Sequence, residues 1–197
     1  MAEVTKSEAH HDEAHVQKEY TILQVALNLA IVCIVSGLII AVTYFITAPI
    51  ALQKNAELEK QAMQNLVEDA TDFVEVTDKA DWYAAQKSGE TIAYIVPAEI
   101  KGYGGIISML VAVSIEDRVL DYKILSANET PGLGDNASKL PFRSQFEGKI
   151  AAALVVTKDK SNTQNIQALT GATITSEAVT KAVRTAQESV VAYMGGN

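Results

Sequence analysis

The sequence predicts an α+β fold: a twisted, mostly antiparallel sheet with helices packed on one side, preceded by one transmembrane helix. Three observations predict it: an uncharged run near the N-terminus, β-branched segments in the middle and an amphipathic helix at the end. With 197 residues, the chain is long enough for one domain with a hydrophobic core and an appendage.

The uncharged run, Ile22–Ile46, comprises 25 residues. As a helix rising about 1.5 Å per residue it would be about 37 Å long, more than the roughly 30 Å hydrocarbon core of a membrane. The alternative, a cleaved signal peptide, normally has a shorter apolar region after a basic start, whereas here the preceding tail is acidic. We therefore expect residues 22–46 to be a retained single-pass anchor. Equal numbers of lysines lie close before and after this segment, so the distribution of positive charge does not decide its orientation in the membrane.

Residues 49–72 are predicted to form a linking helix after the anchor. Proline suits the first position of a helix, which Pro49 would occupy. Apolar residues then recur at spacings near three and four, and they predict a face that packs on the following domain: Ala51, Leu52, Ala56, Met63, Leu66, Val67 and Ala70.

The middle of the chain, from about residue 73 to 157, has a pattern typical of strands. Segments rich in β-branched and aromatic residues predict strands at Thr91–Val96, Ile106–Ile115, Arg118–Leu125 and Ala151–Thr157. Glu116-Asp117 would make a short hairpin connection. The glycines within Lys101–Gly105 predict a turn or bulge before the longest strand.

The C-terminal helix has the clearest pattern in the chain. Its apolar stripe has spacings of four, three and four and consists of Val179, Val183, Ala186 and Val190, widened by Ala178, Ala182 and Val191. Thr175 or Ser176 is available as N-cap, and Gly195 and Gly196 would end the helix.

The composition excludes several classes of function. The formal net charge is -8, whereas binding to nucleic acid needs a concentrated basic face. A single cysteine cannot form an internal disulfide or supply the paired thiolates of a zinc or iron–sulfur site. All three histidines (His10, His11 and His15) lie in the acidic tail, where a solvated segment is favoured over a weak metal site. Without other histidines, redox chemistry would need an organic cofactor.

The segment Leu169–Ser176, with the sequence LTGATITS, precedes the last helix. Gly171 and Ala172 let the backbone come close to a ligand, and a helix start favours an anion through its free N–H groups and dipole. Four hydroxyl side chains within seven residues supply further donors, and each could form a phosphoester. A well-capped helix after a tight loop would use the same residue types, so these residues alone leave both readings open.

A second segment, Glu129–Gly134, reads ETPGLG. Its Pro131-Gly132 pair is typical of a type II turn. A turn lined by glycines can lie against a planar ring that bulkier residues would exclude, although a plain surface turn is the alternative.

Together these segments resemble the flavinylation site of two related FMN-binding domains, RnfG of Rnf complexes and NqrC of sodium-pumping NADH:quinone reductases. The T-G-A-T-I-T-S motif at residues 170–176 carries the resemblance. Residues 101–105, 129–134 and 142–149 also match in order and spacing, as does the single N-terminal span. In that family a flavin transferase, using FAD as donor, esterifies the final threonine of the T-G-A-T core with the phosphate of FMN. That threonine corresponds to Thr173, and Gln167 stands where the family often has Asp.

The resemblance implies a covalent FMN at Thr173, carried as a phosphothreonine ester, with no catalytic residue beyond the flavin and no metal. It implies non-covalent flavin contacts from both motifs: Glu129, Thr130, Gly132, Leu133, Leu169, Thr170, Gly171, Ala172 and Thr175. It further implies a cytoplasmic tail at residues 1–21 and an FMN-binding domain at residues 73–197 outside the cytoplasm.

The function that the resemblance implies is that of RnfG, since this chain has no room for the extra segment seen in NqrC. Rnf complexes oxidise reduced ferredoxin, reduce NAD and move Na+ or H+. This chain would be an electron carrier within one, together with the other membrane and peripheral subunits. The alternatives are NqrC of the quinone reductase and a membrane-tethered flavin-binding sensor module.

Overall fold

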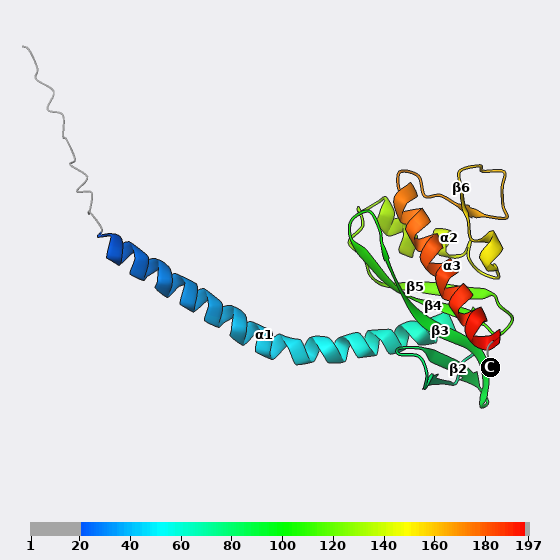
Figure 1. Ribbon diagram of the computed structural model, residues 1–197, viewed down its shortest axis with the longest axis horizontal. Coiled ribbons are helices and arrows are strands. Elements are labelled where there is room, and N and C mark those ends of the chain that lie inside the picture. The colour runs from blue at the N-terminus through cyan, green and yellow to red at the C-terminus, as the bar shows by residue number, and fades with distance from the viewer. Residues whose placement is uncertain (1–20, 196–197) are drawn as a thin grey trace, which may run out of the picture. The chain divides into compact units, whose positions relative to one another are not determined.

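The computed structural model describes residues 21–195, so most of the predicted tail, with its three histidines, and Gly196 lie outside the described residues. The chain divides into two compact units, residues 1–52 and 53–197. A five-stranded antiparallel sheet forms the centre of the second unit, and its strands follow one another in chain order (Figure 1). The strands are β1 (Asp72–Glu75), β2 (Tyr83–Lys87), β3 (Glu90–Lys101), β4 (Ile106–Ser114) and β5 (Val119–Ser126).

The first helix, α1 (Ile22–Leu66), is continuous. Its part from Ile22 to Ala51 is long enough to cross a membrane, and an 18-residue window within it has a mean hydropathy of 2.7 and no buried side chain. The prediction that Pro49 opens a second helix is wrong, because Pro49 lies inside α1. Proline removes the hydrogen bond to the carbonyl of Phe45, but the bonds on either side maintain a helix of this length. The predicted linking helix therefore has no separate start, and it ends at Leu66 instead of residue 72.

Helices cover both faces of the sheet, so the prediction that they pack on one side is wrong. On one face, the end of α1 and the residues after it (Ala62, Met63, Leu66, Val67 and Ala70) pack with Ala85, Ala93, Ile95, Leu110 and Ala112. On the other face lies α3 (Thr173–Gly195), whose predicted stripe of Val179, Val183, Ala186 and Val190 is buried. Strand β4 supplies Ile107, Met109, Val111 and Val113 to this second face. Its nearly continuous apolar sequence suits a strand buried on both sides.

The predicted hairpin at Glu116-Asp117 joins β4 to β5. The amide of Ser114 donates to the carbonyl of Arg118 over 2.8 Å, and Asp117 takes a positive φ of 63° that closes the turn. The buried Gln187 of α3 donates its side-chain amide to the Asp117 carbonyl, which fixes the hairpin to the helix.

The predicted strand at Ala151–Thr157 is largely wrong. Ala151–Ala153 form a 3-10 turn (η2), and β6 comprises Val156–Thr157 alone, paired in parallel with β7 (Ile166–Gln167). The amide of Leu154 donates to the carbonyl of Ala151 over 3.1 Å, which closes the turn. Three consecutive alanines lack the β-branched side chains that favour an extended strand.

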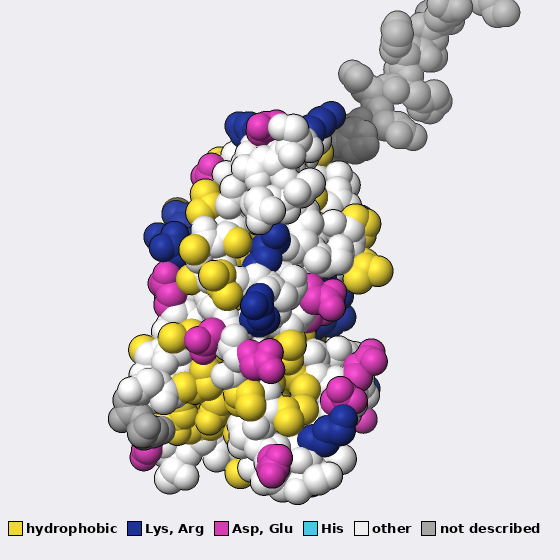
Figure 2. All heavy atoms as spheres, turned by 90° about the vertical axis from the view of Figure 1, so that its right-hand side faces the viewer, with side chains coloured by type: hydrophobic (Ala, Val, Ile, Leu, Met, Phe, Trp, Pro, Cys, Tyr) yellow, Lys and Arg dark blue, Asp and Glu magenta, His cyan; other side chains and the backbone are white. Residues whose placement is uncertain are grey.

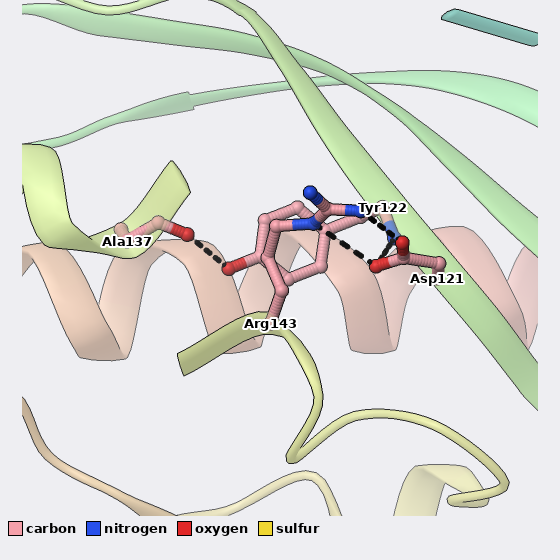
Figure 3. Close-up of polar contacts among 4 residues, drawn as sticks. All are labelled: Asp121, Tyr122, Ala137 and Arg143. Carbon is pink, nitrogen blue, oxygen red and sulfur yellow. Dashed lines mark hydrogen bonds and ion pairs between the residues drawn. The ribbon is translucent and has the colours of Figure 1, made fainter. Parts of the chain in front are cut away.

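The connection after β5 contains a 3-10 turn, η1 (Gly134–Ser138), and a short helix, α2 (Leu140–Arg143). Two contacts tie it to the sheet: the Tyr122 hydroxyl donates to the Ala137 carbonyl over 2.5 Å, and Arg143 pairs with Asp121 (Figure 3). Burial raises the pKa of the Tyr122 phenol, so it remains a hydrogen-bond donor at neutral pH. The start of this connection, Glu129–Gly134, is thereby held close to the sheet.

The surface seen in Figure 2 interleaves basic and acidic side chains, and hydrophobic side chains gather in the lower part of that view. Opposite charges on this face therefore neutralise one another locally and form no extended field of one sign.

Candidate functional site

Helix α3 begins at Thr173, two residues before the predicted N-cap positions. The prediction that Thr175 or Ser176 caps the helix is wrong, because both lie in its first turn. The Ser176 hydroxyl accepts a hydrogen bond from the Leu169 amide over 2.9 Å and donates to the Ala172 carbonyl over 2.8 Å. It therefore ties the preceding loop onto the first turn of the helix.

Gly171 lets that loop reach the helix start. Its φ of 77° lies in the left-handed region, where a side chain would be strained. A Cβ atom at Gly171 would also lie 3.1 Å from Leu133, so the loop packs directly against the Glu129–Gly134 turn.

The Glu129–Gly134 segment is the type II turn that the sequence predicts. The Leu133 amide donates to the Thr130 carbonyl over 3.1 Å, and Gly132 takes a φ of 76°. The Asn136 side-chain amide donates to the Gly132 carbonyl over 2.7 Å and links the turn to η1.

Between this turn and the start of α3 lies a cleft of about 510 Å³. Seven of the predicted site residues line it: Glu129, Thr130, Leu133, Gly171, Ala172, Thr173 and Thr175. Three other predicted site residues do not line the cleft: Gly132 and Thr170, which are exposed, and Leu169, which packs against the core.

Three residues that line the cleft are absent from the predicted site: Tyr103, Gly134 and Ile174. Tyr103 is 70% exposed and Ile174 is 54% exposed, so both side chains are accessible to a ligand in the cleft. Both lie inside motifs that the sequence singles out, residues 101–105 and 170–176, so an apolar residue within a glycine turn or at a helix start is the signal that could have found them.

Glu129 connects three segments around the cleft. Its Oε1 atom accepts a hydrogen bond from the Gly104 amide over 3.0 Å, and its Oε2 atom accepts one from the Thr175 hydroxyl over 2.6 Å. A Cβ atom at Gly104 would lie 1.8 Å from the Asn128 carbonyl oxygen. Glycine at this position therefore lets the β3–β4 turn contact the segment that carries Glu129.

Gln167, at the position where the resemblance leads us to expect Asp, holds the loop before α3. Its side-chain nitrogen donates to the carbonyls of Asp159 over 2.7 Å and Asn162 over 2.6 Å. A carboxylate has no proton to donate to either carbonyl, so these contacts depend on the amide.

The cleft combines two chemical environments. At the start of α3, the first N–H groups lack partners within the helix, and the helix dipole and the half-buried Thr173 hydroxyl favour a phosphate. The apolar side chains of Tyr103, Leu133 and Ile174 line the same cleft. A polar helix start beside apolar side chains fits a phosphate ester of a planar ring, and FMN is such a molecule.

Comparisons with known proteins agree with this geometry. Residues 102–188 match the family model of the FMN-binding domain. In Clostridium ljungdahlii, the subunit termed G of the proton-translocating ferredoxin:NAD(+) oxidoreductase complex is 57% identical to this chain over 176 residues. The match covers 89% of this chain and 95% of the relative. In Acetobacterium woodii, the subunit termed G of the Na(+)-translocating ferredoxin:NAD(+) oxidoreductase complex is 32% identical over 183 residues, covering 82% and 88%.

Among solved structures, Shewanella oneidensis NqrC has a TM-score of 0.50 with this chain at 19% identity, covering 66% of this chain and 73% of that chain. This likeness concerns the fold, and together with the sheet and helices described above it confirms the predicted α+β class.

Proposed function

Because the chain belongs to the RnfG family of ion-translocating ferredoxin:NAD(+) oxidoreductase complexes, we propose that it holds one FMN covalently at Thr173 and relays electrons within such a complex. FMN supplies the redox chemistry. The residues of this chain bind the phosphate, orient the ring and keep the cofactor from being lost. By itself the chain is an electron carrier, and the other subunits of the complex are its partners.

The observation that carries the proposal is the cleft shared by the start of α3 and the Glu129–Gly134 turn. Among the hydroxyls of the motif, Thr173 is favoured as acceptor. It lines the cleft and is half-buried, whereas Thr175 is 1% exposed and its hydroxyl already donates to Glu129. Ser176 is buried and engaged with Ala172, and Thr170 does not line the cleft.

A flavin transferase would make the ester from FAD. The Thr173 oxygen forms a bond to the FMN phosphorus, the phosphoanhydride bond of FAD breaks, AMP leaves, and the hydroxyl proton goes to a base of the transferase. Partial exposure of Thr173 at the first position of α3 leaves its oxygen accessible for this step.

Purification from a host that has the flavin transferase tests the proposal. We expect flavin fluorescence to stay with the chain on a denaturing gel, and cofactor-bearing subunits to copurify in mild detergent. A membrane-tethered sensor module would copurify with none of these subunits. An NqrC protein would bring quinone-reducing partners, and the 57% identity to a component of a ferredoxin:NAD(+) oxidoreductase argues against that assignment.

Membrane orientation provides a prediction. We propose that residues 22–46 span the membrane, with the tail at residues 1–21 in the cytoplasm and the linking helix and the domain at residues 73–197 outside it. Protease added to intact spheroplasts should therefore digest the domain, because it would be exposed outside the membrane. Within the described residues, α1 is the one helix long and apolar enough to anchor it. Protection of the domain in intact spheroplasts, together with digestion after lysis, would reverse the orientation.

A further prediction concerns the domain without its ester. Made as residues 49–197 in the absence of the transferase, it should fold but be colourless, because its core is α3 packed against the sheet and does not include the cofactor. Phosphate contacts at a partly solvated helix start contribute only about 1 kcal/mol each. Binding tighter than about 1 μM would need roughly 8 kcal/mol, so we expect added FMN to bind more weakly.

Titration with FMN followed by fluorescence measures this affinity, and circular dichroism reports whether the domain is folded. Sub-micromolar binding would contradict the expectation and identify non-covalent contacts as the main tether.

A further inference from the structure

Glu129 is the point at which the three segments around the cleft meet. Its carboxylate joins the amide of Gly104 in the β3–β4 turn to the hydroxyl of Thr175 in the first turn of α3. Thr175 is almost completely buried and lies two residues beyond Thr173 on the same helix. The carboxylate thus belongs to the turn that bounds the cleft and is one hydrogen bond removed from the helix that bears Thr173.

Two glycines leave space for this carboxylate. A Cβ atom at Gly102 would lie 2.3 Å from Glu129 Oε1, and one at Gly134 would lie 2.6 Å from Oε2. A side chain at either position would push the flexible carboxylate away from its two hydrogen bonds. The two glycines therefore leave room for the carboxylate where the structure places it.

In the described part of the chain, Glu129 forms no ion pair with a basic side chain. Among the ten residues that line the cleft, Glu129 carries the only charged side chain. A carboxylate in a partly desolvated cleft interacts more strongly with other charges than one in water.

We propose that Glu129 is a positioning residue whose negative charge lowers the midpoint potential of the flavin. This inference rests on the proposed function, since it needs FMN in the cleft. Adding electrons to a flavin makes it more negative or requires it to take up protons, and a neighbouring negative charge disfavours the more negative forms. Glu129 thereby makes the reduced flavin a stronger electron donor while it holds α3 against the β3–β4 turn.

Substitutions at Glu129 can test the effect of its charge separately from the effect of its two hydrogen bonds. In Glu129→Gln, the amide oxygen can accept from the Gly104 amide and the amide nitrogen can donate to the Thr175 hydroxyl, which rotates to accept. This variant keeps both bonds and loses the charge. Glu129→Asp keeps the charge, but its side chain is one methylene shorter and cannot reach both partners.

The test is a spectroelectrochemical titration of the full flavinylated chain in detergent. Glu129→Gln should raise the midpoint potential, with the ratio of reduced to oxidised flavin at a fixed potential rising about tenfold, or about 30 mV for a two-electron couple. Glu129→Asp should keep the wild-type potential. Glu129→Ala lacks both the charge and the hydrogen bonds, and it should also raise the midpoint potential. It serves as the second charge-removing variant if Glu129→Gln does not fold.

Glu116→Gln is the matched control, because it removes the same charge from the hairpin at the opposite end of β4. Its potential should equal that of the wild type. A wild-type potential in Glu129→Gln and Glu129→Ala, or an equal rise in Glu129→Asp, would overturn the inference. Mass spectrometry of the same samples shows separately whether FMN is attached. A wild-type chain without FMN overturns both the proposed function and this inference. Flavinylated Glu129 variants with the wild-type midpoint potential overturn this inference alone.

Discussion

Thr173→Ala is expected to abolish covalent FMN entirely. The native chain should weigh one FMN minus one water more than its sequence mass, and the variant should have the sequence mass, because no other hydroxyl of the motif is both free and in the cleft. Intact-mass spectrometry of chains produced with the flavin transferase measures this directly.

Thr173→Ser is the matched control, since it restores a hydroxyl at the same first helical position and should again carry the added mass. Alanine is a good helix former, so the loss in Thr173→Ala cannot come from a lost helix start. A Thr173→Ala chain that still carried FMN would transfer the assignment to another hydroxyl, with Thr175 examined first.

Phe146→Ala is expected to destabilise the domain by about 3–5 kcal/mol. Phe146 is fully buried, and its ring packs edge-on against Tyr122 and Phe142 at centroid distances of 5.0 and 5.4 Å. This aromatic cluster holds the connection that contains η1 and α2 on the sheet. Removing its central ring leaves a cavity that the flanking segments cannot fill without moving.

Chemical denaturation of the full chain in detergent, followed by the fluorescence of Trp82, measures the free energy of unfolding. Leu140→Ala is the control from the same connection, because Leu140 is 69% exposed and its truncation should change stability by less than about 0.5 kcal/mol. Equal stabilities of the two variants would show that the aromatic cluster does not hold this connection.

Periodicity predicted the parts of the fold in which one pattern dominates. The buried stripe of α3 and the β4–β5 hairpin are such parts, since four-three spacing and a short polar connection between two strand-like segments are local signals. The continuity of α1 through Pro49 was missed, because proline is favoured at helix starts and tolerated within long membrane helices. The number of covered sheet faces depends on packing between distant segments, such as the buried cluster that includes both Leu66 and Leu110, and no local pattern contains this information.

The candidate site was predictable where special backbone geometry demands special residues. Gly132 and Gly171 mark positions of positive φ, and the hydroxyl-rich motif marks a helix start. The bond between Thr175 and Glu129 was not predictable, because it joins residues 46 positions apart. Tyr103 lies in a glycine-rich turn that the sequence singles out, but the place of this turn beside Glu129, 26 residues away, depends on the folded sheet.

Helix α3 packs on one face of the sheet and carries the proposed flavin acceptor, and it follows every strand of the sheet along the chain. Until it emerges, the apolar side chains of Ile107, Met109 and Val111 have no cover, and a nascent chain exposes them to chaperones and proteases. A chain cut short after Thr173 would keep the acceptor motif but lack the residues that complete the core. Cellular quality control would therefore remove incomplete copies before they could enter a membrane complex without a flavin.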